Sequence, residues 1–451
     1  MGKSNLWRLS TGTMAGVMLG GCTFLPRPVS VPEMPADFSG SGLQAVPDRW
    51  WRSFGDGELN RMEERALTSN FSLESAWQRL QQAEAVVDRE RSGLFPDLDA
   101  LLDGEAFSDG AQAASAGLAA SYEIDLWGRI RSRVEAERLR SKASLADYRA
   151  AALTVSAEVA RTWYQLVESR AQRDLVEDQI EANEKVLRQL KVRLREGQGR
   201  AVDVLRQEQL VAATREQKTV VEADIGVLEN RLAVLQGRAP QGGIAATRRK
   251  LPVPPPLPRT GLTTDLVQRR PDLMAAFYRV QAADANLAAA ISERFPRIDL
   301  TGVISTSSER ASSLFDDWLA SVAAGLVAPI LDGGEREAEV RRSRAVREEL
   351  VADYGQAVLV ALREVEDGLV LERQQRARIA KLEKQLKLAD RSYNQLLVEY
   401  LNGVSDYIDV LTALTERQRL ERDLLTARRQ LIGFRIGLYR ALAGGFESRG
   451  G

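Results

Sequence analysis

Residues Arg129–Glu196 read RIRSRVEAERLRSKASLADYRAAALTVSAEVARTWYQLVESRAQRDLVEDQIEANEKVLRQLKVRLRE, 68 residues with no proline and no glycine. A run this rich in Ala, Leu, Arg and Glu predicts one unbroken helix. At about 1.5 Å per residue the helix is about 100 Å long, several times the diameter of a small domain. Apolar residues recur at steps of three and four, as in Val155, Val159 and Trp163. Because no globular core can bury such a helix, the pattern predicts partner helices along its whole length.

Composition narrows the classes of function. The chain has 451 residues, 44% of them hydrophobic and 28% charged, which fits extended helices better than two or three globular domains. The net charge is −1 and basic residues alternate with acidic ones, so no nucleic-acid partner is predicted. The chain contains no His, no Gly-rich phosphate loop and no Gly-x-Ser-x-Gly elbow. We therefore predict no enzyme activity, no cofactor and no metal site.

The N-terminus carries Lys3 and Arg8, then a weakly apolar stretch that is too short to span a bilayer, then Leu19-Gly20-Gly21-Cys22. This arrangement resembles a bacterial lipoprotein signal peptide, residues 1–21, with lipid including palmitate attached at Cys22. The residue after Cys22 is Thr23 rather than Asp, which in such lipoproteins implies the outer membrane. Residues 22–56 are then a lipid-anchored extended segment. A chance cysteine near an ordinary export signal stays the alternative.

An internal repeat organises the rest of the chain. Leu73–Pro96 aligns with Leu273–Pro296, 200 residues later. Beyond the strands the offset between the repeats becomes 206 residues. There Gly197 aligns with Gly403, and Asp203-Val204-Leu205 aligns with Asp409-Val410-Leu411. The sequence therefore predicts two structural repeats, 57–250 and 261–442. A Pro-rich linker, 251–260, joins them, and a tail, 443–451, follows.

Each repeat is expected to contain a helix, a strand pair, a long helix, a Gly-containing turn and another helix. In the first repeat these are helix 57–93, strand pair 97–126, helix 129–196 and helix 201–237. In the second they are helix 263–294, strand pair 297–330, helix 335–402 and helix 405–442. The first and last helices of a repeat together match the long one in length, so stacked end to end they could run beside it.

The expected strands alternate between polar and apolar residues over 10–13 positions, which fits a tilted membrane strand with one face toward lipid and one toward water. A half-buried sheet in a soluble domain shares this pattern and stays an alternative. Acidic residues two apart could also suggest a catalytic or divalent-ion site, but lumen lining is the simpler interpretation. The predicted lumen-lining residues are Asp97, Asp99, Asp103, Glu105, Glu123 and Asp125.

Four strands cannot close a barrel, and an open sheet edge in lipid leaves backbone groups unpaired. The chain must then form oligomers. Two copies give eight strands and an interior filled by side chains, whereas three give twelve strands and leave a passage.

At this point the chain resembles a known family, the bacterial outer-membrane efflux channels of the TolC/OprM type, in their lipoprotein (NodT-like) branch. The matching stretches cover essentially the whole mature chain. They are WWRSFGD at Trp50–Asp56, YEIDLWGR at Tyr122–Arg129, RRPDL at Arg269–Leu273, FPRIDLTG at Phe295–Gly302 and PILDGG at Pro329–Gly334.

The resemblance implies a mainly α fold with a small β part. Three chains would form a periplasmic α-helical barrel continued by a 12-stranded transmembrane β-barrel. It implies the outer-membrane channel of a tripartite efflux system, a passive exit duct for small toxic compounds. The expected partners are two further copies (a homotrimer), a periplasmic adaptor protein, an inner-membrane transporter of the RND type and outer-membrane lipid. A type I protein or peptide secretion duct, and a periplasmic scaffold that never enters the membrane, are the alternatives.

The two Gly turns are the candidate functional site. By resemblance, Asp409 would be a ring carboxylate at the periplasmic aperture, and Asp203 would form a hydrogen-bonded link with Tyr400. The alternative is that both Asp residues only favour the first turn of the following helix. Ser405 departs from the family's pattern, since some members carry a basic residue there. The residues expected to meet the adaptor tips are Gly197, Gly199, Val202, Gly403 and Val404.

Overall fold

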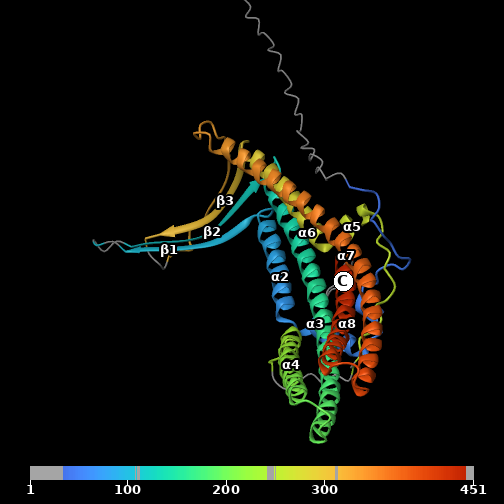
Figure 1. The fold of residues 1–451 in the computed structure, drawn as a ribbon. Helices are drawn as coiled ribbons and strands as arrows, with labels where there is room; N and C mark the ends of the chain where they lie inside the picture. Colours follow the sequence, from blue (N-terminus) through green and yellow to red (C-terminus); the bar gives the residue numbers. More distant parts are fainter. Residues whose placement is uncertain are drawn as a thin grey trace, which may run out of the picture.

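The computed structural model describes residues 34–106, 108, 112–240, 248, 250–309 and 313–442. A long bundle of helices carries a four-stranded sheet at one end (Figure 1). Among the described helices, none is long and apolar enough to cross a membrane. In chain order the elements are η1 (Trp50–Phe54), α1 (Gly57–Ser69), α2 (Phe71–Ser92), β1 (Asp97–Ala106), β2 (Gln112–Ile124), α3 (Arg129–Arg195), α4 (Ala201–Leu235), α5 (Thr263–Arg269), α6 (Pro271–Ser292), β3 (Arg297–Ser308), β4 (Leu319–Val327), α7 (Glu335–Leu401) and α8 (Tyr407–Leu442).

The internal repeat is confirmed. The two long helices, α3 and α7, both have 67 residues, and each follows a glycine in the left-handed conformation. Shorter helices stack end to end beside them, α2 with α4 and α6 with α8. The first joint is closed by the Asn70 side chain, whose Nδ2 donates to the Leu235 carbonyl at 2.9 Å. At the matching joint, Arg270 Nη1 lies 3.4 Å from the Ala441 carbonyl.

The predicted helices 57–93 and 263–294 are wrong in one respect, because each is two helices. The first breaks at Asn70, whose side chain accepts hydrogen bonds from the backbone N–H groups of Ser72 and Leu73 and so caps α2. The second breaks at Arg270, followed by Pro271 at the first helical position, where the missing N–H costs nothing. The breaks fall at matching positions of the repeat.

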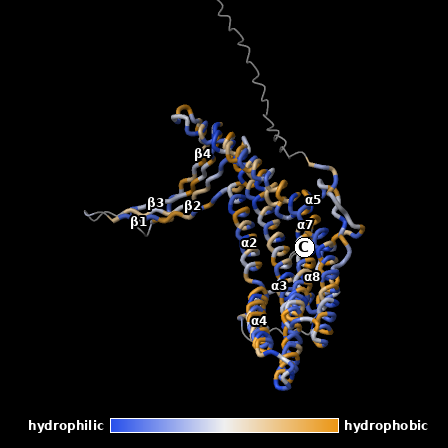
Figure 2. The backbone as a smooth tube through the Cα atoms, in the orientation of Figure 1, coloured by the Kyte–Doolittle hydropathy of each residue, from blue (hydrophilic) through white to orange (hydrophobic). Residues whose placement is uncertain are grey.

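The sheet has the order β1-β2-β3-β4, with every neighbouring pair antiparallel. The register places apolar residues of neighbouring strands next to one another on one face of the sheet. For example, Ala100 of β1 pairs with Leu118 of β2, which pairs with Ile304 of β3. The opposite face carries rows such as Asp103 beside Ser115 and Glu123 beside Asp299. Figure 2 shows hydrophilic and hydrophobic positions mixed along the strands. The sheet thus has one apolar and one polar face, as the alternation predicts.

The main core lies midway along the helices, where η1 and α1 pack on one face of the wall formed by α3 and α8. Trp50 stacks on Tyr439 of α8, with ring centroids 5.6 Å apart. Asp56 is buried; its carboxylate caps α1 by accepting from the Glu58 and Leu59 N–H groups, and it also accepts from Trp163 Nε1 at 2.9 Å. One side chain therefore joins this layer to α3.

The Pro-rich linker is held against the helices. Arg435 of α8 is fully buried and pairs with Glu372 of α7, its Nε lying 2.9 Å from the carboxylate. The same guanidinium donates to the carbonyls of Pro255 and Pro256. Prolines lack an N–H donor but keep their carbonyl acceptors, so the linker is bound through the groups it still has.

Replacing Asp56 with Ala removes the helix cap and leaves the Trp163 N–H unpaired in the core. We expect a loss of about 3 kcal/mol of unfolding free energy, measured by chemical denaturation of the detergent-solubilised protein. Glu64→Ala is the control, because the Glu64 side chain forms an exposed ion pair with Arg52 and no other ion pair within the described ranges, so its loss should change stability little. Equal stability of the two variants would contradict the role given to Asp56.

Candidate aperture and adaptor-contact site

The two turns at the far end of the bundle have the same backbone geometry. After α3, Gly197 has φ +68°, and the N–H of Gln198 donates to the Arg193 carbonyl at 2.8 Å. After α7, Gly403 has φ +77°, and the N–H of Val404 donates to the Glu399 carbonyl at 2.9 Å. This six-residue closure with a left-handed glycine ends a helix sharply. Both repeats therefore reverse direction by the same device.

Asp203 and Asp409 occupy equivalent positions in the first turns of the following helices. The N–H of Asp203 donates to the Arg200 carbonyl, and that of Asp409 to the Asp406 carbonyl, both at 3.1 Å. A carboxylate there interacts favourably with the helix dipole. Their surroundings differ, because Asp203 is buried and Asp409 is exposed. Of the two carboxylates, only that of Asp409 belongs to a residue exposed at the tip.

An ion pair connects the two repeats at the tip. Arg200, which precedes α4, reaches Asp203 at 3.2 Å and also Asp406, which precedes α8, at 3.0 Å. Hydrogen bonding to Asp203, reinforced by the charge of Asp406, raises the pKa of the Arg200 guanidinium. Arg200 is thus the basic residue that pairs the two turns, whereas position 405 carries a serine. The sequence analysis did not single it out: the repeat aligns Arg200 with Asp406, and only the structure shows that the two side chains meet.

Within the described part of the chain, Asp203 and Tyr400 form no hydrogen bond with each other, and their link at a closed aperture stays a prediction. Asp203 accepts from Arg200 instead. Tyr400 is held by ring contacts: the Arg193 guanidinium lies 5.2 Å from its ring centroid and the Tyr407 ring 5.3 Å away. Burial raises the pKa of the Tyr400 hydroxyl. Tyr400 therefore packs α7 against the end of α3.

A buried polar chain behind the tip was missed from sequence. The Tyr407 hydroxyl donates to Gln207 Oε1 at 2.6 Å, and Gln207 Nε2 donates to the Asn183 carbonyl at 2.8 Å. The Asn183 side chain accepts from Gln418 Nε2 at 2.9 Å. These contacts join α3, α4 and α8. The signal available was polar residues at positions where the helical pattern expects apolar ones.

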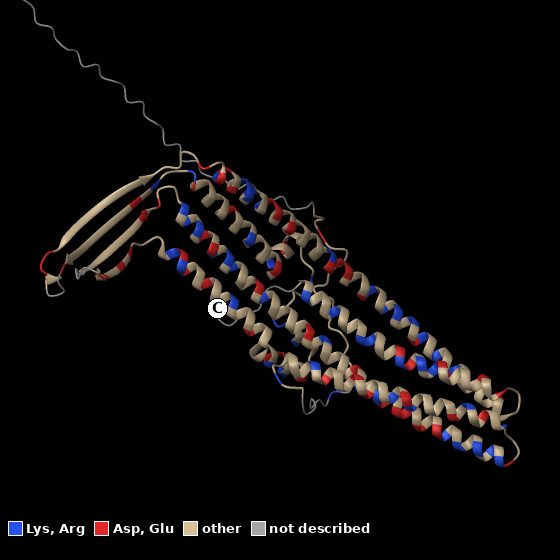
Figure 3. Cartoon of the chain, turned by 90° about the vertical axis from the view of Figure 1, so that its left-hand side faces the viewer, with Lys and Arg blue, Asp and Glu red and all other residues tan. Residues whose placement is uncertain are grey.

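The predicted adaptor-contact residues lie around the two turns. Val202 and Val404 are 43% and 75% exposed, and Gly197 and Gly403 are also exposed. Gly199 is only half-buried, and a Cβ there would lie 3.1 Å from the Leu194 nitrogen, so it serves close packing. Two exposed apolar residues that the sequence did not single out, Leu205 and Ile408, extend the apolar surface onto α4 and α8. Figure 3 shows charges of both signs around this tip.

Five of the six predicted lumen-lining carboxylates share the polar face of the sheet. They are Asp97, Asp99, Asp103, Glu105 and Glu123, all on β1 or β2. Glu123 pairs with Arg129 at the base of the strands, where its carboxylate lies 3.1 Å from the arginine Nε.

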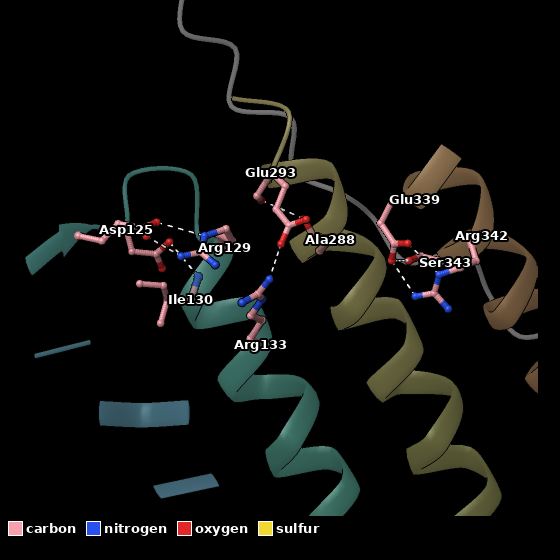
Figure 4. A network of polar contacts seen from close by, with 11 residues as sticks. Asp125, Arg129, Ile130, Arg133, Ala288, Glu293, Glu339, Arg342 and Ser343 are labelled. Atoms are coloured by element: carbon pink, nitrogen blue, oxygen red, sulfur yellow. Dashed lines mark hydrogen bonds and ion pairs between the residues drawn. The ribbon is translucent and has the colours of Figure 1, made fainter. Parts of the chain in front are cut away.

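The sixth, Asp125, is corrected. β2 ends at Ile124, and the Asp125 carboxylate accepts from the backbone N–H groups of Ile130 and Arg131 at 3.0 and 2.9 Å (Figure 4). It caps α3 and so fixes the turn from strand to helix. Figure 4 also shows Arg133 of α3 pairing with Glu293 beyond α6.

Two remaining predictions concern lipid and metal. Cys22 lies outside the described residues. Within the described ranges, no three Cys, Asp or Glu side chains are arranged to hold a metal ion.

Comparison with known proteins decides the family. The outer membrane efflux protein family matches residues 63–238 and 262–444. The chain belongs to this family. It is therefore an outer-membrane channel protein of efflux systems, with the mainly helical fold and small sheet of those channels, located in the outer membrane and extending through the periplasm.

Relatives match over nearly their full length. The pyoverdine export outer membrane protein OpmQ of Pseudomonas aeruginosa is 29% identical, with 96% of each chain covered. The cation efflux system protein CusC of Escherichia coli is 26% identical over 95% of this chain and 97% of its own. The open-state structure of the Neisseria gonorrhoeae outer membrane channel MtrE superposes with a TM-score of 0.84, 26% identity and coverage of 94% and 98%.

A Gly403→Ala variant tests the geometry of the turn. A side chain at positive φ is strained, so we expect a loss of about 1 kcal/mol of unfolding free energy. Gly226→Ala is the matched control, since Gly226 lies inside α4 with open space around it and alanine should favour the helix. Denaturation midpoints give the comparison; destabilisation by Gly226→Ala but not by Gly403→Ala would contradict the assignment.

Proposed function

We propose that three copies of this chain form a passive, lipid-anchored exit duct that joins a periplasmic adaptor protein and an inner-membrane transporter. The single observation that supports this most is the sheet, with an apolar face, a polar face and two open edges on β1 and β4. In lipid such edges need partners, and pairing β4 of one chain with β1 of the next provides them. Twelve strands leave a passage, whereas eight do not.

The anchor and the partners follow from the two ends of the molecule. Lipid attached at Cys22 would hold the chain at the membrane beside the sheet. At the opposite end, the exposed Val202 and Val404 offer an apolar surface to an adaptor. The energy for export would come from an inner-membrane transporter of the RND type, because a duct of this kind needs no catalytic group.

The partner transporter, rather than the duct, is expected to select the exported compound. OpmQ is named for pyoverdine export and CusC for cation efflux, so relatives of one fold are associated with unlike cargoes. Small toxic compounds are the class we propose for this duct.

The aperture gate consists of charges at the tip. Arg200 is held by Asp203 of its own turn and links the turns of the two repeats through its ion pair with Asp406. This ion pair holds the helix pairs together while the pairs are closed. Asp409 is exposed, and three copies around the axis would attract cations. Opening requires the helix pairs to separate, so loss of the Arg200 link should favour it.

Reconstitution into planar lipid bilayers tests the duct. We expect detergent-solubilised trimers that insert and give discrete, cation-preferring single-channel currents. A Cys22→Ser variant should still form channels but lose lipid attachment, seen as a loss of mass by mass spectrometry. A monomer that stays in solution without detergent and produces no current would refute the proposal.

Conductance of tip variants tests the gate. Arg200→Ala should raise the mean open conductance several-fold, because it removes the ion pair between the two turns, and Asp406→Ala, which removes the same ion pair, should raise it similarly. Tyr400→Phe is the matched control, since its hydroxyl makes no hydrogen bond among the described residues, and it should leave conductance unchanged. If Arg200→Ala conducts like the unmodified chain, the link is not part of the gate.

An Asp409→Ala variant tests ion selectivity and should reduce the preference of the channel for cations.

A further inference from the structure

Arg161 of α3 is a half-buried cation that lacks an anionic partner. Among the described residues, its guanidinium makes no hydrogen bond and no ion pair. Burial lowers the pKa of Arg161, and the nearby charge of Arg440 lowers it further. The carboxylates that act on it from a distance, Glu158 and Glu364, are paired with Arg231 and Arg440. Positive charge is therefore in excess here, and an anion is the missing partner.

A cavity of about 220 Å³ opens beside this guanidinium, between α3 and α8. Two glycines of α8 provide the room. A Cβ at Gly437 would lie 3.2 Å from Arg161 Nη2, and at Gly433 no neighbouring atom lies within 4 Å of the Cβ position. The residues that define the cavity for this argument are Arg161, Tyr164, Gln165, Gln430, Gly433 and Phe434.

The lining combines hydrogen-bond donors with aromatic walls. Gln430 Oε1 already accepts from Gln375 at 3.1 Å and Arg378 at 2.9 Å, which leaves the Gln430 amide nitrogen to donate. Phe434 contributes a ring surface, whereas Tyr164, which also lines the cavity, is buried and packs its ring on Phe54 of η1. The volume is below the ~300 Å³ at which drug-sized sites begin. The cavity therefore fits a small, flat molecule with one acidic group.

The cavity faces away from the layer formed by η1 and α1. Trp163 of α3 and Ile432 of α8 belong to the core beneath that layer. At 100° per residue, Arg161 and Gln165 lie about 160° around the helix from Trp163, and Phe434 and Gln430 lie equally far from Ile432. The α3–α8 seam is also central in the chain, flanked by α4 and α7. The cavity thus opens on the uncovered face, the one suited to line a duct, away from the edges where another copy packs.

We propose that this cavity binds a small aromatic carboxylate, whose acidic group pairs with Arg161 while its ring lies against Phe434. Gln430 donates a second hydrogen bond to the carboxylate. If the cavity lies on the lumenal wall, aromatic carboxylates would be a class of exported compound. This interpretation of the ligand as cargo rests on the proposed duct. The binding itself does not depend on channel activity.

Fluorine NMR of 4-fluorobenzoate with the full-length, detergent-solubilised protein tests the site. We expect saturable line broadening that excess benzoate reverses and neutral benzamide does not. Arg161→Gln should weaken binding about tenfold or more, and Arg161→Lys should retain part of it. Gly433→Leu fills the cavity without removing a charge and should abolish binding. Arg373→Gln, an exposed arginine of α7, is the charge-matched control and should bind normally.

Equal broadening with Arg161→Gln and the unmodified protein, or equal competition by benzamide, would overturn the proposal. Bilayer recordings of the same preparation separate the two claims. A protein that conducts but does not bind 4-fluorobenzoate refutes only the site, and one that binds it but never conducts refutes only the duct.

Discussion

The structure depends on the unpaired edges of its sheet. A strand edge presents a row of N–H and C=O groups, and each of them left unpaired in hydrocarbon costs several kcal/mol. One chain provides four strands with both edges open, which is tolerable only if copies close on one another. The apolar face then meets lipid, the polar face encloses water, and the long helices that continue the strands must form a wall around the same axis.

The repeat explains how one chain builds a symmetrical wall from unequal parts. Both long helices follow a left-handed glycine, and both end in the same six-residue closure at Gly197 and Gly403. The joints between stacked short helices also correspond, at Asn70 and Arg270. The two halves also differ at the tip. At the tip, equivalent positions before α4 and α8 carry Arg200 and Asp406, which can pair only because the repeats have diverged.

Much of the fold was predictable from the sequence, since its signals are local. The run without Pro or Gly set the length of α3, and polar–apolar alternation set the faces of the sheet. The breaks at Asn70 and Arg270 were missed although the sequence carries their signals, a capping asparagine at 70 and a proline at the first helical position, 271. Likewise, the alternation extends through Asp125, although the strand ends at Ile124 and the carboxylate caps α3.

The candidate site was less predictable than the fold, because it depends on contacts between segments that are far apart in the sequence. The position of Asp203 was predictable, but the ion pair between its neighbour Arg200 and Asp406 was not, since that depends on how two turns approach each other in space. The missing partner of Arg161 was equally hidden, because the sequence shows only a helix with many charges of both signs.

Cysteine cross-linking between sheet edges tests the central claim most directly. A Cys22→Ser chain would carry one cysteine on the apolar face of β1, at Leu98 or Leu102, and one on β4, at Ala320, Val322 or Ala324. Oxidation in intact outer membranes should yield, for at least one pairing, a covalent ladder that ends at the trimer. A ladder that ends at the dimer, or no cross-link in any pairing, would contradict the closed twelve-stranded barrel.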